Sequence, residues 1–285
     1  MAVDAFAQAE SSPSRLGDRG VTVMGILNVT PDSFSDGGQF QQTQSAIERA
    51  VLMSQQGASI IDVGGESTRP RSKGISVDEE LDRVIPVIEG IRKRIDTLIS
   101  IDTSKPIVMQ EAVSAGAGFI NDVRALREPE ALCTAAQLGV PICLVHMKGE
   151  PHTMQDNPTY GNVVNDVRAF LKSRAGVCEK AGIAATDIYL DPGFGFGKAL
   201  EHNMELLRNL GRLIELGWPV LIGLSRKQMV GALLGDLKRD RTAGSVALAM
   251  LAAVKGVSIL RVHDVAETID AIRVLGKVGA VELAF

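Results

Sequence analysis

Residues 21–29 read VTVMGILNV, and residues 30–38 continue as TPDSFSDGG. The first stretch is a continuous run of mostly apolar and β-branched residues, which is typical of a parallel strand buried on both faces. The second stretch holds two aspartates, two serines, a proline and paired glycines, which is more polar chemistry than a simple turn requires. Together they predict a buried strand whose carboxyl end opens into a functional loop.

The same alternation of a short apolar run and a longer amphipathic run repeats along the chain. Seven further strands are predicted at 58–65, 97–103, 118–123, 141–146, 187–192, 219–225 and 258–263. Eight strand–helix units predict an α/β fold of the (β/α)8 TIM-barrel type. An open doubly wound sheet is the alternative, but the glycine fingerprint expected after its first strand does not occur. We expect a flexible tail over 1–20 and a single catalytic barrel domain over 21–280.

Helical stripes and glycines support this organisation. One helix has an apolar face that Pro86 interrupts, formed by Leu81, Val84, Ile85, Ile88, Ile91 and Ile95. A second stripe consists of Leu206, Leu207, Leu210, Leu213 and Ile214. Several helical runs are followed by a glycine that suits a C-terminal cap, at Gly57, Gly116, Gly139, Gly182 and Gly217. The stretch PGFGFGK at 192–198 lacks the Walker spacing, so we interpret its glycines as a loop that makes a close approach.

Composition excludes several classes of function. The net charge is −4 and the basic residues are dispersed, which argues against a nucleic-acid partner. The longest apolar stretch, SVALAMLAAV, is far too short to span a membrane, and the N-terminus lacks a signal-peptide pattern, so we expect a cytoplasmic protein. The three cysteines show no CxxC spacing and are predicted to be core thiols. HExxH and GxSxG motifs are both missing, which disfavours a zinc site and acyl transfer.

Polar side chains stand at the carboxyl end of every predicted strand. They are Asn28, Asp62, Asp102, Asn121 with Asp122, His146, Asp191, Ser225, and Arg261 with His263. Singly, each has an ordinary explanation as a helix cap or a satisfied polar group. In a closed barrel, however, all eight ends meet at one mouth, where the active sites of this fold lie. The coincidence predicts a functional mouth.

The residue types at this mouth indicate the chemistry. A cationic set, Arg69, Lys227, Arg261 and His263, suits a phosphate-bearing substrate. Asp102, Asn121 and Asp191 suit a neutral heterocycle with N–H donors along one edge. Asn28 could hold magnesium (Mg²⁺), which keeps several waters and binds phosphate oxygens. The residues therefore support an enzyme that acts on a phosphorylated or pyrophosphorylated heterocycle, without naming the heterocycle.

At these positions the sequence resembles the dihydropteroate synthase family over residues 20–278. The resemblance rests on the blocks GILNVTPDSFSDGG, DVGGESTRP, SIDTSKP, INDV, LVHMKGEP, DPGFGFGK, GLSRK and RVHDV. It implies condensation of 6-hydroxymethyl-7,8-dihydropterin pyrophosphate with p-aminobenzoate, giving 7,8-dihydropteroate and pyrophosphate. These two small molecules are then the expected substrates, with Mg²⁺ as the expected cofactor.

The resemblance also implies a role for each matching residue. The pterin pocket would consist of Asp102, Asn121, Met147, Asp191, Phe194, Lys227 and Arg261. The pyrophosphate would bind Asn28, Thr68, Arg261 and His263, with Asn28 also on the metal. The p-aminobenzoate pocket would consist of Phe34, Ser67, Thr68, Arg69, Pro70 and Ser225. Asp36, Arg69, Lys227 and Arg261 would act in catalysis, and Gln228 departs from the serine that many members carry.

The implied mechanism is a dissociative substitution, in which pyrophosphate leaves and the arylamine attacks a delocalised pterin cation. Loops would exclude water, and Asp36 would stabilise the cation. Three alternatives share parts of this pattern: a pterin-binding methyltransferase barrel, a catalytically inactive pterin-binding scaffold, and a phosphate-binding isomerase or lyase. The methyltransferases lack the TPDSFSDGG and ESTRP loops, which this chain has.

The stretch AGSVALAMLAAVKG at 243–256 predicts a helix that is apolar nearly all round. Most barrel helices expose a polar face, so this helix requires either a second partner or a tightly packed inner position. The resemblance implies a homodimer that uses this region.

Overall fold

The computed structural model describes residues 20–30, 39–67, 72, 74–150 and 153–281. Residues 1–19 of the tail predicted over 1–20 lie outside these ranges, as do five predicted site residues: Phe34, Asp36, Thr68, Arg69 and Pro70. Their predicted roles stay predictions. None of the helices in the described part of the chain is long and apolar enough to cross a membrane.

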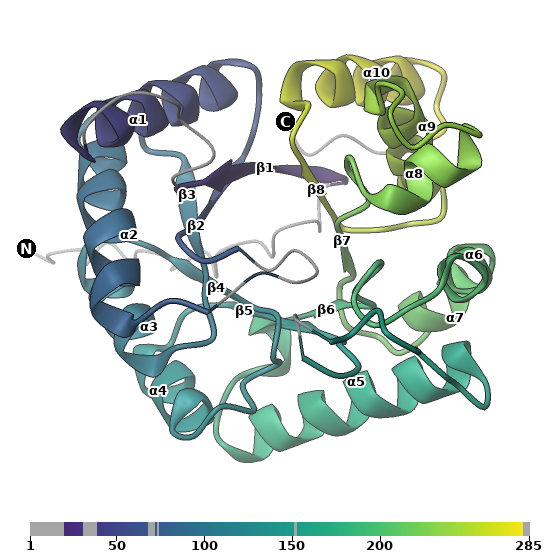
Figure 1. The fold of residues 1–285 in the computed structure, drawn as a ribbon, viewed down its shortest axis with the longest axis horizontal. Coiled ribbons are helices and arrows are strands. Elements are labelled where there is room, and N and C mark those ends of the chain that lie inside the picture. Colours follow the sequence, from purple (N-terminus) through teal and green to yellow (C-terminus); the bar gives the residue numbers. More distant parts are fainter. Residues whose placement is uncertain (1–19, 31–38, 68–71, 73, 151–152, 282–285) are drawn as a thin grey trace, which may run out of the picture.

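Eight parallel strands form the centre of the molecule (Figure 1). They are β1 (Thr22–Asn28), β2 (Ile60–Gly64), β3 (Leu98–Asp102), β4 (Phe119–Asp122), β5 (Ile142–Val145), β6 (Ile188–Asp191), β7 (Leu221–Ile222) and β8 (Ile259–Val262). Their order is β6-β5-β4-β3-β2-β1-β8-β7, and an isolated parallel bridge from Leu190 to Val220 joins the two ends. This confirms the prediction of a (β/α)8 barrel in one domain.

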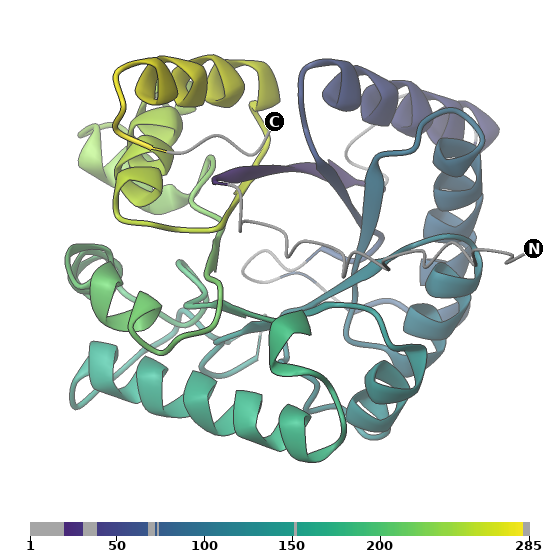
Figure 2. The same ribbon diagram turned by 180° about the vertical axis from the view of Figure 1, so that it is seen from behind.

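Helices cover the outside of the strands as a ring, which Figure 2 shows from behind. They are α1 (Gln39–Gln55), α2 (Val77–Arg92), α3 (Pro106–Ser114), α4 (Ala131–Leu138), α5 (Val163–Lys180), α6 (Leu200–Arg208), α7 (Leu210–Ile214), α8 (Gln228–Leu233), α9 (Thr242–Val254) and α10 (Val265–Lys277), with a 3₁₀ turn at Ala185–Asp187. The predicted stripe over Leu206–Ile214 is therefore shared by two helices, α6 and α7, rather than one. Asn209 separates them, and its amide nitrogen donates to Glu205 O.

The predicted second helix forms without a break at its proline. Ser76 caps α2 by accepting a hydrogen bond from Glu79 N at 3.1 Å, and the helix continues through Pro86. The helix ends at Arg92, before Ile95, but Ile95 N still donates to Ile91 O at 3.0 Å and its side chain packs against the same buried core as Leu81 and Ile85. The prediction that glycines end helices is confirmed. Their positive φ angles are +107° at Gly57, +116° at Gly116, +64° at Gly139, +97° at Gly182 and +89° at Gly217.

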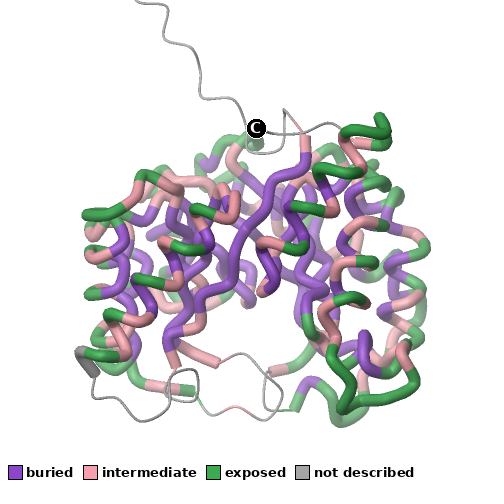
Figure 3. Tube along the Cα trace, turned by 90° about the horizontal axis from the view of Figure 1, so that it is seen from above, coloured by how far each residue is buried: buried purple, intermediate pink, exposed green. Residues whose placement is uncertain are grey.

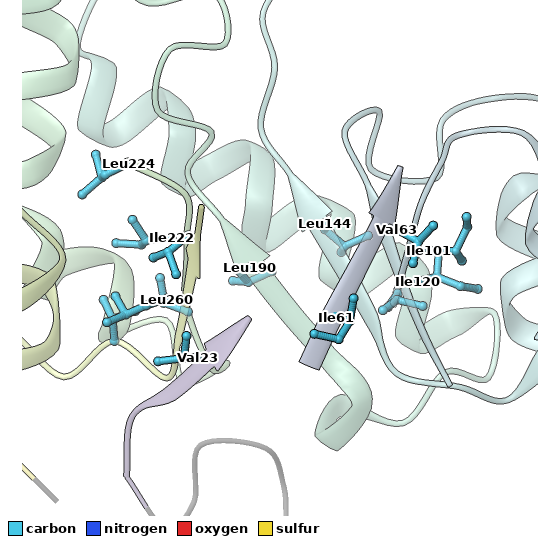
Figure 4. Close-up of a cluster of buried hydrophobic side chains, with 14 of the residues drawn as sticks. Val23, Ile61, Val63, Ile101, Ile120, Leu144, Leu190, Ile222, Leu224 and Leu260 are labelled. Carbon is cyan, nitrogen blue, oxygen red and sulfur yellow. The ribbon is translucent and has the colours of Figure 1, made fainter. Parts of the chain in front are cut away.

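Two apolar clusters divide the core. The outer cluster lies between the strands and the helices, and Figure 4 shows its strand side chains, among them Val23, Ile61, Leu144 and Leu260. The inner cluster takes side chains from all eight strands: Met24, Ile60, Leu98, Phe119, Cys143, Val145, Tyr189, Leu221 and Ile259, with Val123, Met147 and Met154. Figure 3 shows the strands as the most deeply buried part of the molecule. The inner cluster therefore marks which side chains point into the barrel.

Candidate active site

Successive side chains on a strand alternate between its faces, so residues two positions apart share a face. Counting in twos from the inner apolar cluster toward the carboxyl ends reaches a polar layer. It consists of Asn28, Asp62, Ser100, Asp102, Asn121, Asp191, Ser225, Arg261 and His263. The interior is thus apolar below and polar at the mouth. The predicted convergence of polar side chains is present, and seven predicted site residues take part in it.

Two strand-end residues that were expected at the mouth face the other way. Asp122 is fully buried on the outer side of β4, where it accepts hydrogen bonds from Arg124 N at 2.8 Å and Leu126 N at 2.7 Å. His146 follows β5 and packs on Phe170, with ring centroids 4.9 Å apart. Alternation places their neighbours Asn121 and Met147 inside instead. The prediction that every strand contributes a polar group to the mouth was therefore wrong for β5.

Arg261 is the centre of the polar layer. Its Nε donates to Asp62 Oδ2 and its terminal nitrogen to Asp102 Oδ2, both at 2.6 Å. Asp62 is fully buried and also accepts from Ser100 Oγ at 2.6 Å and from Asn121 Nδ2 at 3.2 Å. Four strands are thus connected through one carboxylate. The sequence prediction placed Asp62 at the mouth but gave it no role in the site, although its spacing of two from Ile60 could have indicated one.

Asn121 has an open acceptor. Its Nδ2 donates to Asp62, whereas its Oδ1 is buried and has no hydrogen-bond partner among the described residues. A buried polar atom without a partner is costly unless a ligand or water completes it. Asn121 faces the mouth, so this oxygen indicates a ligand that carries an N–H or O–H donor.

A second charged pair lies across the mouth, at β6 and the start of α8. Asp191 is 5% exposed and accepts a hydrogen bond from Gly193 N at 2.6 Å through Oδ1. The ammonium of Lys227 donates to Phe194 O and lies 4.6 Å from the ring centroid of Phe196. Together they present an acceptor and a donor to the same space.

Burial changes the acidity of these groups. It raises the pKa of Asp102 to about 7, against the opposing effect of Arg261. It also raises the pKa of Asp191, which Lys227 opposes. The pKa of Lys227 falls to about 8 because burial disfavours the charged form, while Asp191 favours it. Asp102 and Lys227 are therefore poised so that modest electrostatic changes alter their charge.

The glycine-rich stretch after β6 makes the predicted close approach. A Cβ on Gly193 would lie 2.0 Å from His146 O, and one on Gly197 would lie 2.1 Å from Lys148 O. The same stretch corrects one predicted side chain. Phe194 is fully buried in the outer cluster, so its ring does not line the mouth, and it is Phe196 that packs against the inner cluster beside Lys227. Met147 lies inside as expected.

The remaining predicted residues lie at the β1 and β8 ends of the mouth. Asn28 ends β1, and its Oδ1 lies 3.9 Å from the position that a Cβ on Gly64 would take. The hydroxyl of Ser225 accepts from His263 N at 3.1 Å and lies 3.0 Å from His263 Nδ1. Ser225 is thus joined to a predicted pyrophosphate residue, although it was predicted for p-aminobenzoate. Ser67 is half-buried at the end of a described segment.

A cavity of about 410 Å³ lies beside the mouth, at the carboxyl ends of β3 and β4. Asp102 and Val123 form its wall toward the barrel, and Lys105 and Arg124 line it farther out. Lys105 forms ion pairs with Glu66 and with the buried Glu80. Glu66 directly precedes Ser67, so this cluster anchors the described base of the second predicted loop.

Comparison with known proteins agrees with this geometry. A family model described as "Pterin binding enzyme" matches residues 24–263. The dihydropteroate synthase of Haemophilus influenzae is 53% identical over 252 residues, covering 88% of this chain and 92% of the relative. The Escherichia coli enzyme is also 53% identical, covering 89% and 90%.

Solved structures give the same result. A Xanthomonas albilineans dihydropteroate synthase in complex with 7,8-dihydropteroate has a TM-score of 0.83 and 48% identity, covering 92% of this chain and 94% of that one. A Yersinia pestis dihydropteroate synthase with a sulfonamide drug has a TM-score of 0.87 and 49% identity, covering 92% and 95%. The chain belongs to the pterin-binding enzyme family and, within it, to the dihydropteroate synthases.

Proposed function

We propose that this protein joins 6-hydroxymethyl-7,8-dihydropterin pyrophosphate to p-aminobenzoate and releases 7,8-dihydropteroate and pyrophosphate. The observation that carries the proposal is the polar layer at the mouth, with the open oxygen of Asn121 between Asp102 and Asp191. Such an arrangement fits a flat heterocycle with N–H donors on one edge. The relatives named as dihydropteroate synthases support the choice of heterocycle.

The pterin ring would lie across the mouth with its amidine-like edge on Asp191. Gly193 N already occupies Oδ1 of that carboxylate, so we assign Oδ2 to the pterin. Asn121 Oδ1 would accept another ring hydrogen, and Lys227 would donate to the pterin carbonyl. Met147 and Phe196 would form apolar walls. Phe196 replaces Phe194 in this assignment because its ring is the one beside Lys227.

The pyrophosphate would lie toward β1 and β8. Asn28, Arg261 and His263 are the described residues we assign to it, and Ser225 orients His263. Arg261 remains fixed by Asp62 and Asp102, so it is already oriented before substrate binds. Held in place, the guanidinium would stabilise negative charge that grows on the leaving group.

Asn28 fits Mg²⁺ by its chemistry. The described residues contain no group of three histidine, cysteine or acidic side chains that could form an all-protein metal site. Mg²⁺ instead favours one or two protein oxygens completed by water and substrate phosphate oxygens, and the Asn28 amide supplies such an oxygen. Bound there, the ion would neutralise charge on pyrophosphate. Arg261 and His263 would orient the same group.

The reaction we propose is dissociative. The bond from the exocyclic carbon to the pyrophosphate oxygen breaks first, the electron pair leaves with pyrophosphate, and the dihydropterin ring delocalises the positive charge. The arylamine nitrogen then forms the new bond and loses a proton. Asp36 and Arg69, together with the rest of the p-aminobenzoate set, stay predictions for this step. Excluding water would keep the cation from being captured.

One assay tests the function. Purified protein is incubated with dihydropterin pyrophosphate, Mg²⁺ and labelled p-aminobenzoate, and labelled dihydropteroate is measured together with released pyrophosphate. We expect product, competition by a sulfonamide, and loss of product in Lys227→Ala, whereas Lys172→Ala on the exposed face of α5 stays active. Pterin binding without condensation would favour the inactive scaffold or the methyltransferase.

We also propose a homodimer and a cytoplasmic location. Six of the eight large, exposed apolar side chains in the described chain lie on or beside α8, α9 and α10: Leu233, Leu237, Leu251, Val254, Val274 and Val278. These helices adjoin each other in Figure 1. Because α9 exposes Leu251 and Val254, the alternative of a tightly packed inner helix does not hold for it. A second copy of the chain would cover this face.

Fractionation of cells would test the proposed cytoplasmic location.

A further inference from the structure

The last residue of the DPGFGFGK stretch has no part in the site described so far. Lys198 is only 2% exposed, and its Nζ has no carboxylate within hydrogen-bonding distance among the described residues. It contacts four acceptors instead: His146 Nδ1 at 2.9 Å, His146 O at 3.2 Å, Gly193 O at 2.9 Å and Phe196 O at 3.0 Å. A buried ammonium surrounded by neutral acceptors is unusual and requires an explanation.

The acceptors specify the protonation states. Three of the four are carbonyl oxygens, which can only accept, so Lys198 is the donor to each of them, and the three N–H groups of its ammonium are shared among four acceptors. His146 is neutral because burial, with the Lys198 cation beside it, lowers its pKa to about 2. Its Nδ1 therefore offers a lone pair to Lys198, and the other ring nitrogen carries the proton. Burial lowers the pKa of Lys198 as well, and nearby Asp191 opposes that effect.

The acceptors come from two loops that line the pterin site. His146 follows β5 and directly precedes Met147, whereas Gly193 and Phe196 follow β6 and enclose Phe194. Within this second loop, Gly193 N donates to the Asp191 carboxylate and Phe194 O accepts from the Lys227 ammonium. The two groups that would contact the pterin edge are therefore both bonded to the loop that surrounds Lys198.

Two further hydrogen bonds hold this loop: Phe196 N donates to Gly193 O at 3.0 Å, and the Gln155 side chain donates to Gly195 O. Its glycines adopt left-handed conformations, with φ of +66° at Gly193, +80° at Gly195 and +62° at Gly197. On its outer side, Asn203 accepts from Gly195 N at 2.8 Å, and Tyr160 donates to Gly197 O at 2.8 Å. The inward carbonyls of residues 193 and 196 converge on the Lys198 ammonium. The loop is thus wound around its own terminal lysine.

We propose that Lys198 is a positioning residue of the pterin pocket: its ammonium gathers the carbonyls of His146, Gly193 and Phe196 and thereby fixes Asp191 and Lys227 for the pterin edge. This inference rests on the proposed pterin site. It assigns Lys198 no contact with substrate, and none with p-aminobenzoate. Removing the ammonium should therefore weaken pterin binding more than p-aminobenzoate binding, which a general loss of folded protein would not do.

The test compares Lys198→Met with Lys172→Met, a control on the exposed face of α5. Binding of 6-hydroxymethylpterin alone is measured by calorimetry, and KM is measured for both substrates. For Lys198→Met we expect the pterin Kd and the KM for dihydropterin pyrophosphate to rise about 10- to 100-fold, as misplacement of site groups does. The KM for p-aminobenzoate should change by less than about twofold, as should every constant of the control.

Two results would overturn the inference: a folded Lys198→Met protein with unchanged pterin affinity, or one in which both KM values rise equally. Should Lys198→Met fail to fold, Lys198→Gln is measured instead, since its amide supplies two of the three N–H groups. Native pterin affinity in that variant would also overturn the inference. If the wild-type protein binds no pterin, the proposed function and the inference both fail. If the wild type binds pterin and the Lys198 variants bind it with the same Kd, only the inference fails.

Discussion

At the mouth of the barrel a single guanidinium is shared by two carboxylates from different strands. Arg261 bonds Asp62, which is fully buried, and Asp102, which is mostly buried. A buried ion pair often adds little stability, because desolvation offsets much of the attraction between the charges. Its effect here is on geometry: the planar guanidinium has a fixed direction before substrate arrives. Asn121, whose side-chain amide also donates to Asp62, is oriented by the same carboxylate.

The pH dependence of activity should show this electrostatic balance. Asp102 has a pKa raised to about 7, so acid removes its charge as pH falls through 7 and weakens its bond to Arg261. Lys227 has a pKa lowered to about 8, so its donor ammonium is lost as pH rises through 8. We expect kcat/KM for dihydropterin pyrophosphate to be highest between about 7 and 8 and to fall on both sides.

Two variants assign the limbs of that profile. Asp102→Asn cannot ionise and should lose the acidic limb, while Lys227→Arg stays charged and should lose the alkaline limb. Each variant keeps the other limb. A profile whose limbs are the same in both variants and the wild type would show that other groups, such as the substrate phosphates, control the pH dependence.

Asp62 and Asp122 form a matched pair that separates function from stability. Both are fully buried aspartates on neighbouring parts of the sheet, but Asp62 faces the mouth and Asp122 faces the helices. We expect Asp62→Asn to lower kcat/KM about 100-fold, because Arg261 and Asn121 lose their common acceptor. Asp122→Asn should lower the free energy of unfolding by about 1–3 kcal/mol and leave KM unchanged.

Both variants are measured by steady-state kinetics at a temperature where each is folded, and by urea unfolding. Equal kinetic effects in the two variants would contradict the assignment of Asp62 to the site. So would a native KM and kcat in Asp62→Asn.

The sequence could predict which residue types converge at this mouth but not the face on which each lies. Parallel strands are apolar on both faces, so a run such as GFINDV carries no mark that separates inside from outside. Asn121 and Asp122 were therefore both placed at the mouth. The three-dimensional alternation, fixed by Phe119 in the inner cluster, is what distinguishes them.

At the scale of elements, the loop after β6 shows how backbone conformation limits sequence. Gly193 and Gly197 have positive φ and would also place a Cβ about 2 Å from a carbonyl oxygen of the loop after β5. Gly182 and Gly217 have positive φ as well, but nothing lies within 4 Å of the Cβ position. Replacing these glycines by alanine therefore separates two contributions to the free energy of unfolding: strain from a positive φ angle, and overlap of the new methyl group with a neighbouring carbonyl.

We expect Gly193→Ala to lower the free energy of unfolding by about 3 kcal/mol or more, since strain and overlap add together. Gly217→Ala should cost only about 1 kcal/mol, from conformation alone. Urea unfolding of the two variants checks both values. If both variants lose the same free energy of unfolding, the loop must move away from His146 to accommodate the methyl group.

The sequence predicted which strands form more accurately than it predicted where each strand begins and ends. All eight strands form where apolar runs predicted them, yet β7 is only Leu221–Ile222 instead of 219–225. The strand lies at the seam where the barrel closes through one bridge to Leu190, so few ladder bonds extend it. Hydrogen bonding to a neighbour, which a single strand's sequence does not contain, decides where a strand ends.

At the scale of the whole molecule, the mouth of the barrel and its outer helical faces differ in the side chains that they expose. The mouth gathers the charged side chains of Asp62, Asp102, Asp191, Lys227 and Arg261, and the rest of the described helical ring exposes few large apolar side chains. The exception is the face of α8, α9 and α10, where Leu251, Val254 and Val274 are 43%, 54% and 63% exposed. Several exposed apolar side chains on adjacent helices indicate an interaction surface. The sequence predicted the apolar helix, but which of its residues stay exposed depended on how α9 packs.

Sedimentation of the full chain tests whether a second copy covers this face. We expect the wild type to sediment at twice its 30.3 kDa subunit mass. Replacing Leu251 and Val254 together by Glu should give monomers, because burying two carboxylates against an apolar partner costs far more than the contacts return. Leu52→Glu on α1, a residue 42% exposed outside this face, should leave the dimer intact. A wild type that is monomeric at micromolar concentration would contradict the proposed dimer. A double variant that remains a dimer would show that the interface lies on another face. Because neither residue lies at the mouth, the monomeric variant should still bind 6-hydroxymethylpterin, which separates assembly from the site.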